Sequence, residues 1–593
     1  MKRLLLLATL LPLVTATAAP AGVRAVWAVS DGEKVASDDR AHPLRAANAV
    51  WDGRGVRLLG ARNEIVAFQV VVEADERGID AVRVSLPELR QSASRIAYAP
   101  PATDPSLYAG RPIQLFTVRS MKVTQESRAE WVWAPGSSAA PRKTVGFQPV
   151  QLVPENARAG RGGFPVGIAP NEVQAFWIEI DTGRGRPAGA YGGTVSVSAD
   201  GETRALPVAL RILDFDLPDA NSLDAMVFYE PDQPELYQGR NLDPAYHRFA
   251  HHHRVELVHA YDEAKVKAHP GRFNGADFTP ATGYEGPGQG IGNRVVPRSF
   301  YGPGREFREK ETAWPAADAW MTFVNTTLPG ARTFLYLPDE PYPPHYAEVK
   351  GYADRVRSNP GPGGKLPLFL TKRIIPEFQG LIDIWSIPPQ ALDLPAVAAE
   401  RAKGRGVSFY NSGRPQGPAL IIDAPATEAR VVAWAAFKHD IDLYFFWHGD
   451  HWRHNSQKQG ERNQDVWGNP ITFDNRGQPN KPIEDQGTIN GDGVLFYPGE
   501  EKLHPEQDRG LAGPVGTVQL ANLRRGLQDH QYLTLARRLG LEAQVKEALA
   551  AIVPRVFSDA GPTVSFPESG EPFEAVRRKL GEAIEVRIKG GSR

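Results

Sequence analysis

The N-terminal third of the chain alternates apolar and polar residues in short runs separated by Gly, Asp and Pro. A period of two with many Val, Ile, Phe and Trp residues predicts β-strands. The Asp200-Gly201 pair between two such runs is typical of a tight hairpin turn. The pattern therefore predicts a β-sandwich domain over residues 22–216. The runs are 64–74, 81–89, 112–123, 175–183, 192–203 and 204–215.

Beyond a boundary rich in Pro, Asp and Asn at residues 216–222, short apolar runs alternate with amphipathic segments. This order predicts parallel β/α units, and the number of units indicates a barrel. We therefore expect a (β/α)8 TIM-like catalytic barrel in residues 217–593, with a C-terminal helical region over 522–553 that breaks near Gly540. The expected strands are 225–230, 333–337, 366–371, 382–386, 406–412 and 442–448, and the expected helices include 343–358, 395–404 and 426–440.

Residues 1–21 have the layout of a secretory signal peptide. Lys2 and Arg3 precede an apolar stretch from Leu4 to Val14, which is too short to span a bilayer, and small residues follow it. We therefore expect a bacterial protein that is periplasmic or secreted after cleavage, and we exclude this segment from the fold.

The composition is that of a globular protein, with 41% hydrophobic and 23% charged residues. Lys and Arg total 68 against 69 Asp and Glu, so no net charge attracts nucleic acid or an anionic membrane. The chain has no Cys, which excludes disulfides and thiolate metal sites. We expect no membrane span after the N-terminal segment, and the oligomeric state stays open.

Two carboxylates stand side by side directly after a predicted barrel strand, in the stretch TFLYLPDEP (333–341). Asp339 and Glu340 lie between Pro338 and Pro341, which restrict the backbone. Strand ends carry the catalytic groups in parallel barrels. If both carboxyl groups reach the barrel mouth, repulsion and desolvation raise one pKa, and the pair can perform acid/base chemistry on an acetal.

Aromatic and polar side chains follow several of the other predicted strands. Flat aromatic faces pack against sugar rings, and Asn, Asp, His and Tyr hydrogen-bond to hydroxyls and amides. We therefore expect a glycan-binding surface at these strand ends. The candidate substrate-binding residues are Trp385, Tyr410, Asn411, Trp447, His448, Asp450 and Trp452.

Other motifs do not predict a cofactor or a metal site. The histidines at 251–253 are consecutive and point in different directions on a helix. The Gly-rich stretch 286–292 lacks the strand and the Lys-Ser/Thr partner of a phosphate loop. No GxSxG nucleophile elbow occurs. We expect no cofactor and no metal.

Several stretches, in order along the chain, resemble glycoside hydrolase family 123 and its relatives in the domain-of-unknown-function 4091 group. A helix that often carries Glu-Asp in this family has Gln528-Asp529 here, a difference that we expect to be structural. The resemblance implies a β-sandwich followed by a (β/α)8 barrel. The stretches are 61–72, 335–341, 382–385, 428–447, 491–499 and 523–533.

The family resemblance also implies an exo-acting β-N-acetylgalactosaminidase with substrate-assisted, retaining catalysis. Glu340 would be the general acid/base, and Asp339 would orient and stabilise the 2-acetamido group of the sugar. Two alternatives stay open: a retaining glycosidase on non-acetamido sugars with a separate nucleophile, for which Asp450 is a candidate, and a non-catalytic carbohydrate-binding protein. In each case the partner is a glycan or glycoconjugate.

Overall fold

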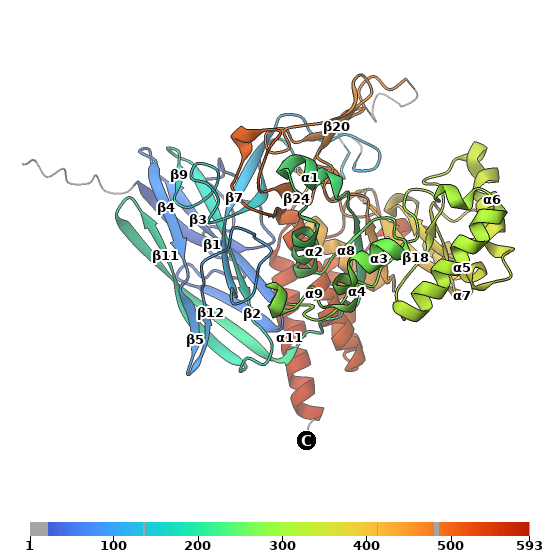
Figure 1. Cartoon of the computed structure of the whole chain (residues 1–593). Helices are drawn as coiled ribbons and strands as arrows, with labels where there is room; N and C mark the ends of the chain where they lie inside the picture. Colours follow the sequence, from blue (N-terminus) through green and yellow to red (C-terminus); the bar gives the residue numbers. More distant parts are fainter. Residues whose placement is uncertain (1–21, 134–136, 412, 480–485, 592–593) are drawn as a thin grey trace, which may run out of the picture.

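The computed structural model describes residues 22–133, 137–411, 413–479 and 486–591, so the predicted signal peptide lies outside the described residues. The chain combines two facing, mainly antiparallel sheets with a curled parallel sheet, and the expected combination of β and α/β parts is confirmed. The antiparallel sheets lie at one end of the molecule and the parallel sheet with its helices at the other (Figure 1).

The antiparallel part forms as the alternation predicts. Strands β11 (Gly189–Ala199) and β12 (Glu202–Asp216) form a hairpin. Its turn residues Asp200 and Gly201 have φ of +44° and +89°, as a type I′ turn requires. Side chains of both sheets share one apolar core, which includes Val70 of β3 and Leu206 of β12.

The first sheet has the order β1 (Val23–Ser30), β3 (Ile65–Ala74), β10 (Val173–Asp181), β7 (Ile113–Val123), β8 (Gly146–Pro154), β25 (Pro514–Thr517) and β24 (Phe496–Pro498). The second has the order β2 (Val56–Arg62), β12, β11, β4 (Ile79–Ser85) and β9 (Val166–Ile168), with β5 (Glu88–Gln91) beside β11 and β6 (Ser94–Ala97) beside β5. Strands β24 and β25 lie within residues 217–593, the part that we assigned to the barrel, yet they extend the first sandwich sheet.

Seven parallel strands form the third sheet. One pairing joins β13, the first strand of this sheet in chain order, to β19, the last, and the sheet is curled. Apolar side chains from opposite ends of the sheet meet on the inner face, among them Met226, Phe369 and Phe445. The order is β14 (Glu256–Val258), β13 (Asp224–Phe228), β19 (Leu443–Phe446), β18 (Gly406–Tyr410), β17 (Ile384–Ile387), β16 (Leu368–Thr371) and β15 (Leu335–Tyr336).

The expected closed barrel of eight strands is not what the hydrogen bonds of the described residues show. An irregular segment, residues 294–299, lies between β15 and β14. On the β15 side it makes backbone bonds, such as Arg298 N to Phe334 O at 2.8 Å. On the β14 side, the Glu256 carboxylate accepts from the backbone N–H groups of Arg294 and Val295. Pro297 has no N–H, so this segment cannot form a full strand ladder.

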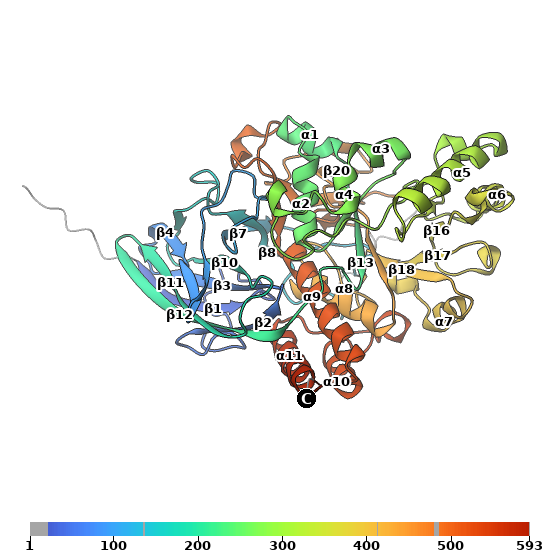
Figure 2. The same ribbon diagram turned by 60° about the horizontal axis from the view of Figure 1, so that its bottom comes forward.

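Helices cover the outer face of the parallel sheet, and α5, α6 and α7 lie at the end remote from the sandwich (Figures 1 and 2). A small sheet of β21 (Gly460–Asn463), β20 (Arg453–Ser456), β22 (Ile471–Asp474) and β23 (Thr488–Asn490) follows β19. The helices are α1 (Asp232–Gln238), α2 (Asp243–His252), α3 (Glu263–Ala268), α4 (Pro270–Asn274), α5 (Lys310–Thr327), α6 (Tyr346–Arg357), α7 (Leu394–Ala402), α8 (Thr427–Lys438), α9 (Val518–Arg538), α10 (Glu542–Ile552) and α11 (Glu571–Gly591).

Helix α9 runs between the sandwich and the parallel part, where it contacts both β8 and α8 (Figure 2). At Gly526 of α9, a Cβ atom would lie 2.5 Å from the carbonyl oxygen of Arg430 in α8. The two helices therefore approach more closely than any other residue at position 526 would permit. The sequence predicted this helical region, including its break at Gly540, which has φ of +74°.

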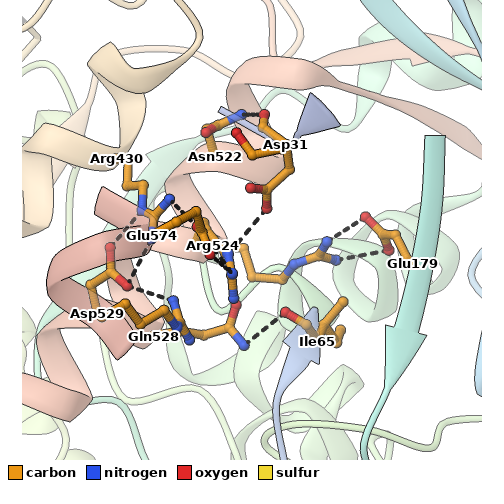
Figure 3. Close-up of polar contacts among 12 residues, drawn as sticks. Asp31, Ile65, Glu179, Arg430, Asn522, Arg524, Gln528, Asp529 and Glu574 are labelled. Carbon is orange, nitrogen blue, oxygen red and sulfur yellow. Dashed lines mark hydrogen bonds and ion pairs between the residues drawn. The ribbon is translucent and has the colours of Figure 1, made fainter. Parts of the chain in front are cut away.

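A buried cluster of charged side chains surrounds α9, and we call it the α9 ion network. Asp529 accepts from Arg430 Nε at 2.6 Å and from Trp434 Nε1 at 2.9 Å. Arg524, on the other side of α9, pairs with Glu179 of the sandwich (Figure 3). The network thus ties the sandwich, α8, α9 and α11 together. Its members are Asp31, Glu64, Glu179, Arg430, Arg524, Arg525, Asp529, Glu574 and Arg577.

Candidate active site

The pair Asp339-Glu340 follows β15 at the carboxyl end of the parallel sheet. Glu340 has φ of +41°, a left-handed conformation that is rare for residues other than Gly. Its backbone N–H donates to Thr371 Oγ1 of the neighbouring strand β16 at 3.1 Å. Such backbone strain is concentrated at functional sites, and here it allows two consecutive residues to face the same cavity.

Asp339 is held by two neutral hydroxyl groups. Tyr336 OH and Thr371 Oγ1 both donate to its Oδ1, each at 2.7 Å. Tyr336 precedes Asp339 by three residues, and Thr371 ends β16. Both bonds end on Oδ1, and no group of the described residues donates to Oδ2, which can therefore accept a hydrogen bond from a ligand.

Glu340 accepts a hydrogen bond from Tyr410 OH at its Oε1. Partial burial raises the pKa of Glu340 above its usual value, and the charge of Asp339 raises it further. The Tyr410 bond and the charge of Lys372 act in the opposite direction and only partly offset the rise. Both carboxyl groups are open to the cavity. A carboxyl group with a raised pKa, in contact with solvent, can donate and take back a proton.

The cavity in front of the pair has a volume of about 620 Å³, a size that suits a small ligand. Residues after β15, β16, β17, β18 and β19 line it, as expected for strand ends. The lining residues are Glu130, Trp131, Tyr301, Tyr336, Asp339, Glu340, Thr371, Lys372, Arg373, Pro388, Gln390, Ala391, Tyr410, Asn411, Phe445, Trp447, Phe473 and Asp492.

Two tryptophans of this lining donate hydrogen bonds to one buried carboxylate. Trp447 Nε1 donates to Asp492 Oδ1 at 2.8 Å, and Trp131 Nε1 donates to Asp492 Oδ2 at 3.2 Å. Trp447 follows β19, whereas Trp131 lies in the connection between β7 and β8 of the sandwich. The sandwich therefore contributes directly to the cavity, and the paired indoles offer an aromatic surface for a sugar ring.

Of the predicted substrate-binding residues, Tyr410, Asn411 and Trp447 line the cavity. Asn411 has φ of +51°, and its Oδ1 accepts from the backbone N–H of Trp447 at 3.1 Å. Its side chain therefore holds the turn that carries the Trp447 indole. Tyr410 reaches the pair directly.

His448 and Asp450 lie together behind the cavity, outside its lining. Asp450 is 0% exposed, and its Oδ1 lies 3.1 Å from His448 Nδ1 and accepts from the Glu230 backbone N–H at 3.2 Å. Burial raises the pKa of Asp450 above its usual value. The structure therefore gives these two residues a supporting position next to Trp447.

Trp385 and Trp452 lie in the core away from the cavity. Trp385 Nε1 donates to Glu400 of α7 at 3.3 Å, and Trp452 Nε1 donates to the Phe496 carbonyl at 2.7 Å. Both side chains are 0% exposed. Successive strand residues face opposite sides of a sheet, and on β17 it is Ile384 that packs against the inner cluster.

Sequence reasoning missed several residues of the cavity. Tyr336 and Thr371 lie within predicted strands, where no local pattern distinguishes them from core residues. Asp492 belongs to the stretch GDGVLFYPG, which contributed to the family resemblance. Trp131 had no signal, because nothing in a sandwich sequence indicates that one of its loops reaches a distant sheet.

Among the described residues, no group of three or more His, Cys, Asp or Glu side chains could hold a metal ion. In the same part of the chain, no helix is long and apolar enough to cross a membrane.

Comparison with known proteins relates part of the chain to a glycosidase family. Residues 374–536 match the family model described as "Glycoside hydrolase 123, catalytic domain", and this match supports glycosidase activity. The resemblance to glycoside hydrolase family 123 is therefore confirmed for this segment. It includes Tyr410, Asn411, Trp447 and Asp492, whereas Asp339 and Glu340 precede it.

A solved structure of a family 123 glycoside hydrolase from Clostridium perfringens is similar over almost the whole chain. It has a TM-score of 0.61 at 11% identity and covers 95% of this chain and 98% of its own, which indicates a shared fold. The Clostridium perfringens enzyme is described as one of glycolipid glycan hydrolysis.

Two other solved structures resemble the chain much less, and no curated protein sequence matches it. A β-glucuronidase from Parabacteroides merdae has a TM-score of 0.23 at 9% identity, covering 66% of this chain and 46% of its own. A family 2 β-galacturonidase from Eisenbergiella tayi has a TM-score of 0.27 at 10% identity, covering 86% and 96%. Scores this low support no conclusion about this chain.

Proposed function

We propose that the protein is an exo-acting β-N-acetylgalactosaminidase that uses substrate-assisted, retaining catalysis. The observation that carries this proposal is the placement of Asp339 and Glu340 together in one cavity, each with one oxygen held by a hydroxyl and the other available. Two adjacent carboxylates on one side of a ligand suit a reaction in which the substrate supplies the nucleophile.

In the first step, the protonated Glu340 donates its proton to the glycosidic oxygen as the bond to the leaving group breaks. The carbonyl oxygen of the 2-acetamido group attacks C1 from the other face and forms a cyclic oxazolinium ion. Asp339 Oδ2 accepts the N–H of that group and stabilises its positive charge. The negative charge of Asp339 also raises the pKa of Glu340, which favours the proton-donating form.

In the second step, the Glu340 carboxylate takes a proton from water, and the resulting hydroxide oxygen bonds to C1. The acetamido oxygen leaves C1, the ring opens, and the product keeps the β configuration. Glu340 returns to its protonated form, so the cycle balances without an enzyme nucleophile, in contrast to the usual two-carboxylate scheme.

The alternative with a separate enzyme nucleophile has less support in the geometry. A retaining enzyme needs its second carboxylate about 5 to 5.5 Å from the acid and in contact with the sugar. Asp450 is fully buried and outside the cavity lining. Asp492 lines the cavity, but both of its oxygens accept indole N–H groups.

A panel of chromogenic β-glycosides with and without the 2-acetamido group tests the proposal. We expect cleavage of 2-acetamido sugars alone, with galacto preferred over gluco configuration, and strong inhibition by a thiazoline analogue of the oxazolinium ion. Full activity of an Asp339→Asn enzyme would contradict the mechanism. Sugar binding without cleavage of any glycoside would instead favour a carbohydrate-binding protein.

Export belongs to the same proposal. The basic, apolar and small-residue segments within residues 1–21 are typical of a signal peptide, so the enzyme would act on glycans in the periplasm or outside the cell. Cell fractionation followed by N-terminal sequencing of the mature protein tests this expectation.

A further inference from the structure

Two positively charged side chains, Lys372 and Arg373, line the cavity beside the catalytic pair. They directly follow Thr371, the last residue of β16, whose hydroxyl bonds to Asp339. The end of β16 therefore positions both cations and, through Thr371, also orients Asp339. Both cationic side chains belong to the cavity wall.

Neither cation has a carboxylate partner within 4.0 Å in the part of the chain that the structure describes. The carboxylates of Asp339, Glu340 and Asp492 accept hydrogen bonds from hydroxyl or indole groups instead. The arginines of the α9 ion network, in contrast, do pair with acids. Lys372 and Arg373 therefore do not neutralise the carboxylates of the cavity by forming ion pairs with them.

The neighbouring wall of the cavity adds no negative charge. The lining residues after β17 are Pro388, Gln390 and Ala391, which are all neutral. Glu130 also lines the cavity, but it comes from the β7–β8 connection. The wall built by the β16 and β17 loops is therefore locally positive and polar.

Lys372 lies close enough to Glu340 for its charge to lower the pKa of that group. In the proposed function Glu340 protonates the oxygen of the leaving group. The inference rests on that role, because the role determines on which side of the scissile bond the two cations lie. A cation near Glu340 is then next to the sugar unit on the leaving-group side of the scissile bond.

We propose that Lys372 and Arg373 form a subsite for an anionic group, a carboxylate or a sulfate ester, carried by the leaving-group sugar. A guanidinium fork and an ammonium are the side chains that bind such oxyanions most strongly. The preferred substrate is then an N-acetylhexosamine linked to an acidic sugar, rather than one linked to a neutral sugar.

Matched disaccharides test this subsite. N-acetylgalactosamine β-linked to glucuronic acid, to glucose or to glucose 6-sulfate differs only in the charged group. We expect the wild-type kcat/KM to be about tenfold to hundredfold higher for an acidic disaccharide than for the neutral one, as a single charge-assisted hydrogen bond would give. Whether the enzyme prefers the carboxylate or the sulfate ester identifies the anionic group that the subsite binds. The preference should shrink when the ionic strength is raised.

In the double variant Lys372→Gln/Arg373→Gln, the ratio of acidic to neutral kcat/KM should fall to about one. The matched control Lys350→Gln/Arg538→Gln removes the same charge from two exposed residues outside the cavity and should keep the wild-type ratio. Equal wild-type rates on all three disaccharides, or a preference that survives in the double variant, would overturn the subsite.

Binding to the Glu340→Gln protein separates the subsite from the proposed function. Tighter binding of an acidic than of the neutral disaccharide, lost on adding the double substitution, supports the subsite even if the wild-type enzyme cleaves neither. Cleavage with equal affinity for all three disaccharides rejects the subsite and leaves the proposed function standing. If none of the three disaccharides binds, the proposed subsite for a carboxylate or a sulfate ester is rejected.

Discussion

Carboxylates in two regions of the molecule, the α9 ion network and the cavity, have partners of opposite kinds. In the α9 ion network, Asp529 meets guanidinium groups from Arg430 and Arg577. In the cavity, Asp339 and Glu340 accept hydrogen bonds from the hydroxyl groups of Tyr336, Thr371 and Tyr410. The same residue type therefore has cationic partners where the two halves join and neutral partners where chemistry is proposed.

The pKa values follow this difference. Burial alone would raise the pKa of Asp529, but Arg430 and Arg577 reverse the effect and lower it. Burial raises the pKa of Glu340, and its neutral donor Tyr410 only partly offsets the rise. A carboxylate paired with cations stays ionised and fixes structure, whereas one bound by hydroxyls can exchange a proton.

Glu340→Gln should give the largest effect. Loss of the general acid/base should lower kcat/KM by about 10² to 10⁴-fold, measured with a chromogenic 2-acetamido glycoside, because the amide cannot donate or accept the required proton. The melting temperature should stay close to that of the wild type, since Glu340 faces the cavity. Glu348→Gln on exposed α6 serves as the control, with wild-type activity. If the Glu340→Gln enzyme retained more than a tenth of the wild-type activity, Glu340 would not be the general acid/base.

Asp529→Asn should act on stability instead. It removes one of the two acidic partners of the buried Arg430 and of the buried Arg577, and breaking a buried ion pair costs about 3 to 5 kcal/mol. Urea denaturation followed by tryptophan fluorescence measures the loss. The control Lys579→Met breaks an exposed pair with Glu547 at 3.1 Å and should cost at most about 1 kcal/mol. An equal loss of unfolding free energy in both variants would show that the α9 ion network does not stabilise the contact between the sandwich and the helices.

Tyr410→Phe should give the smallest effect, seen mainly in the pH profile. Tyr410 donates to the ionised form of Glu340, so its removal raises the pKa of Glu340 further. An acid with a higher pKa stays protonated to higher pH, and the alkaline limb of the kcat/KM profile should therefore move upward. Activity at the optimum should fall by about tenfold, the lower end of the range for one hydrogen bond to a charged group. Tyr342→Phe, an exposed tyrosine outside the cavity, should leave the limb in place. A downward shift in Tyr410→Phe would contradict the assignment.

Local sequence patterns predicted the elements well where neighbouring residues determine them. The β11–β12 hairpin follows from alternation and the Asp-Gly turn, and the break between α9 and α10 follows from Gly540. Helix α5 was missed; Pro315 stands inside it, a residue that normally argues against a helix interior. The segment at 294–299 was missed because its partners on either side lie in separate parts of the chain.

The candidate site was predictable only in part, for the same reason. The position of Asp339 and Glu340 after a strand could be inferred from TFLYLPDEP alone. Which aromatic residues share the cavity depends on the face of the sheet: Tyr410 packs with the inner cluster, whereas its neighbour Phe409 and Trp385 belong to the outer core. Strand-end position does not determine this face. The bond from Trp131 to Asp492 spans 361 residues, beyond the reach of any local pattern.

The reach of Trp131 from the sandwich into the cavity has a consequence for how such proteins can change over evolutionary time. An appended binding module can be exchanged, duplicated or lost while the enzyme to which it is attached keeps working. Here an exchange at residue 216 would remove part of the cavity wall, and the sandwich itself would lose β24 and β25. The two halves are therefore expected to be inherited as one unit, and altered substrate preference should arise through substitutions in their loops rather than through recombination of whole domains.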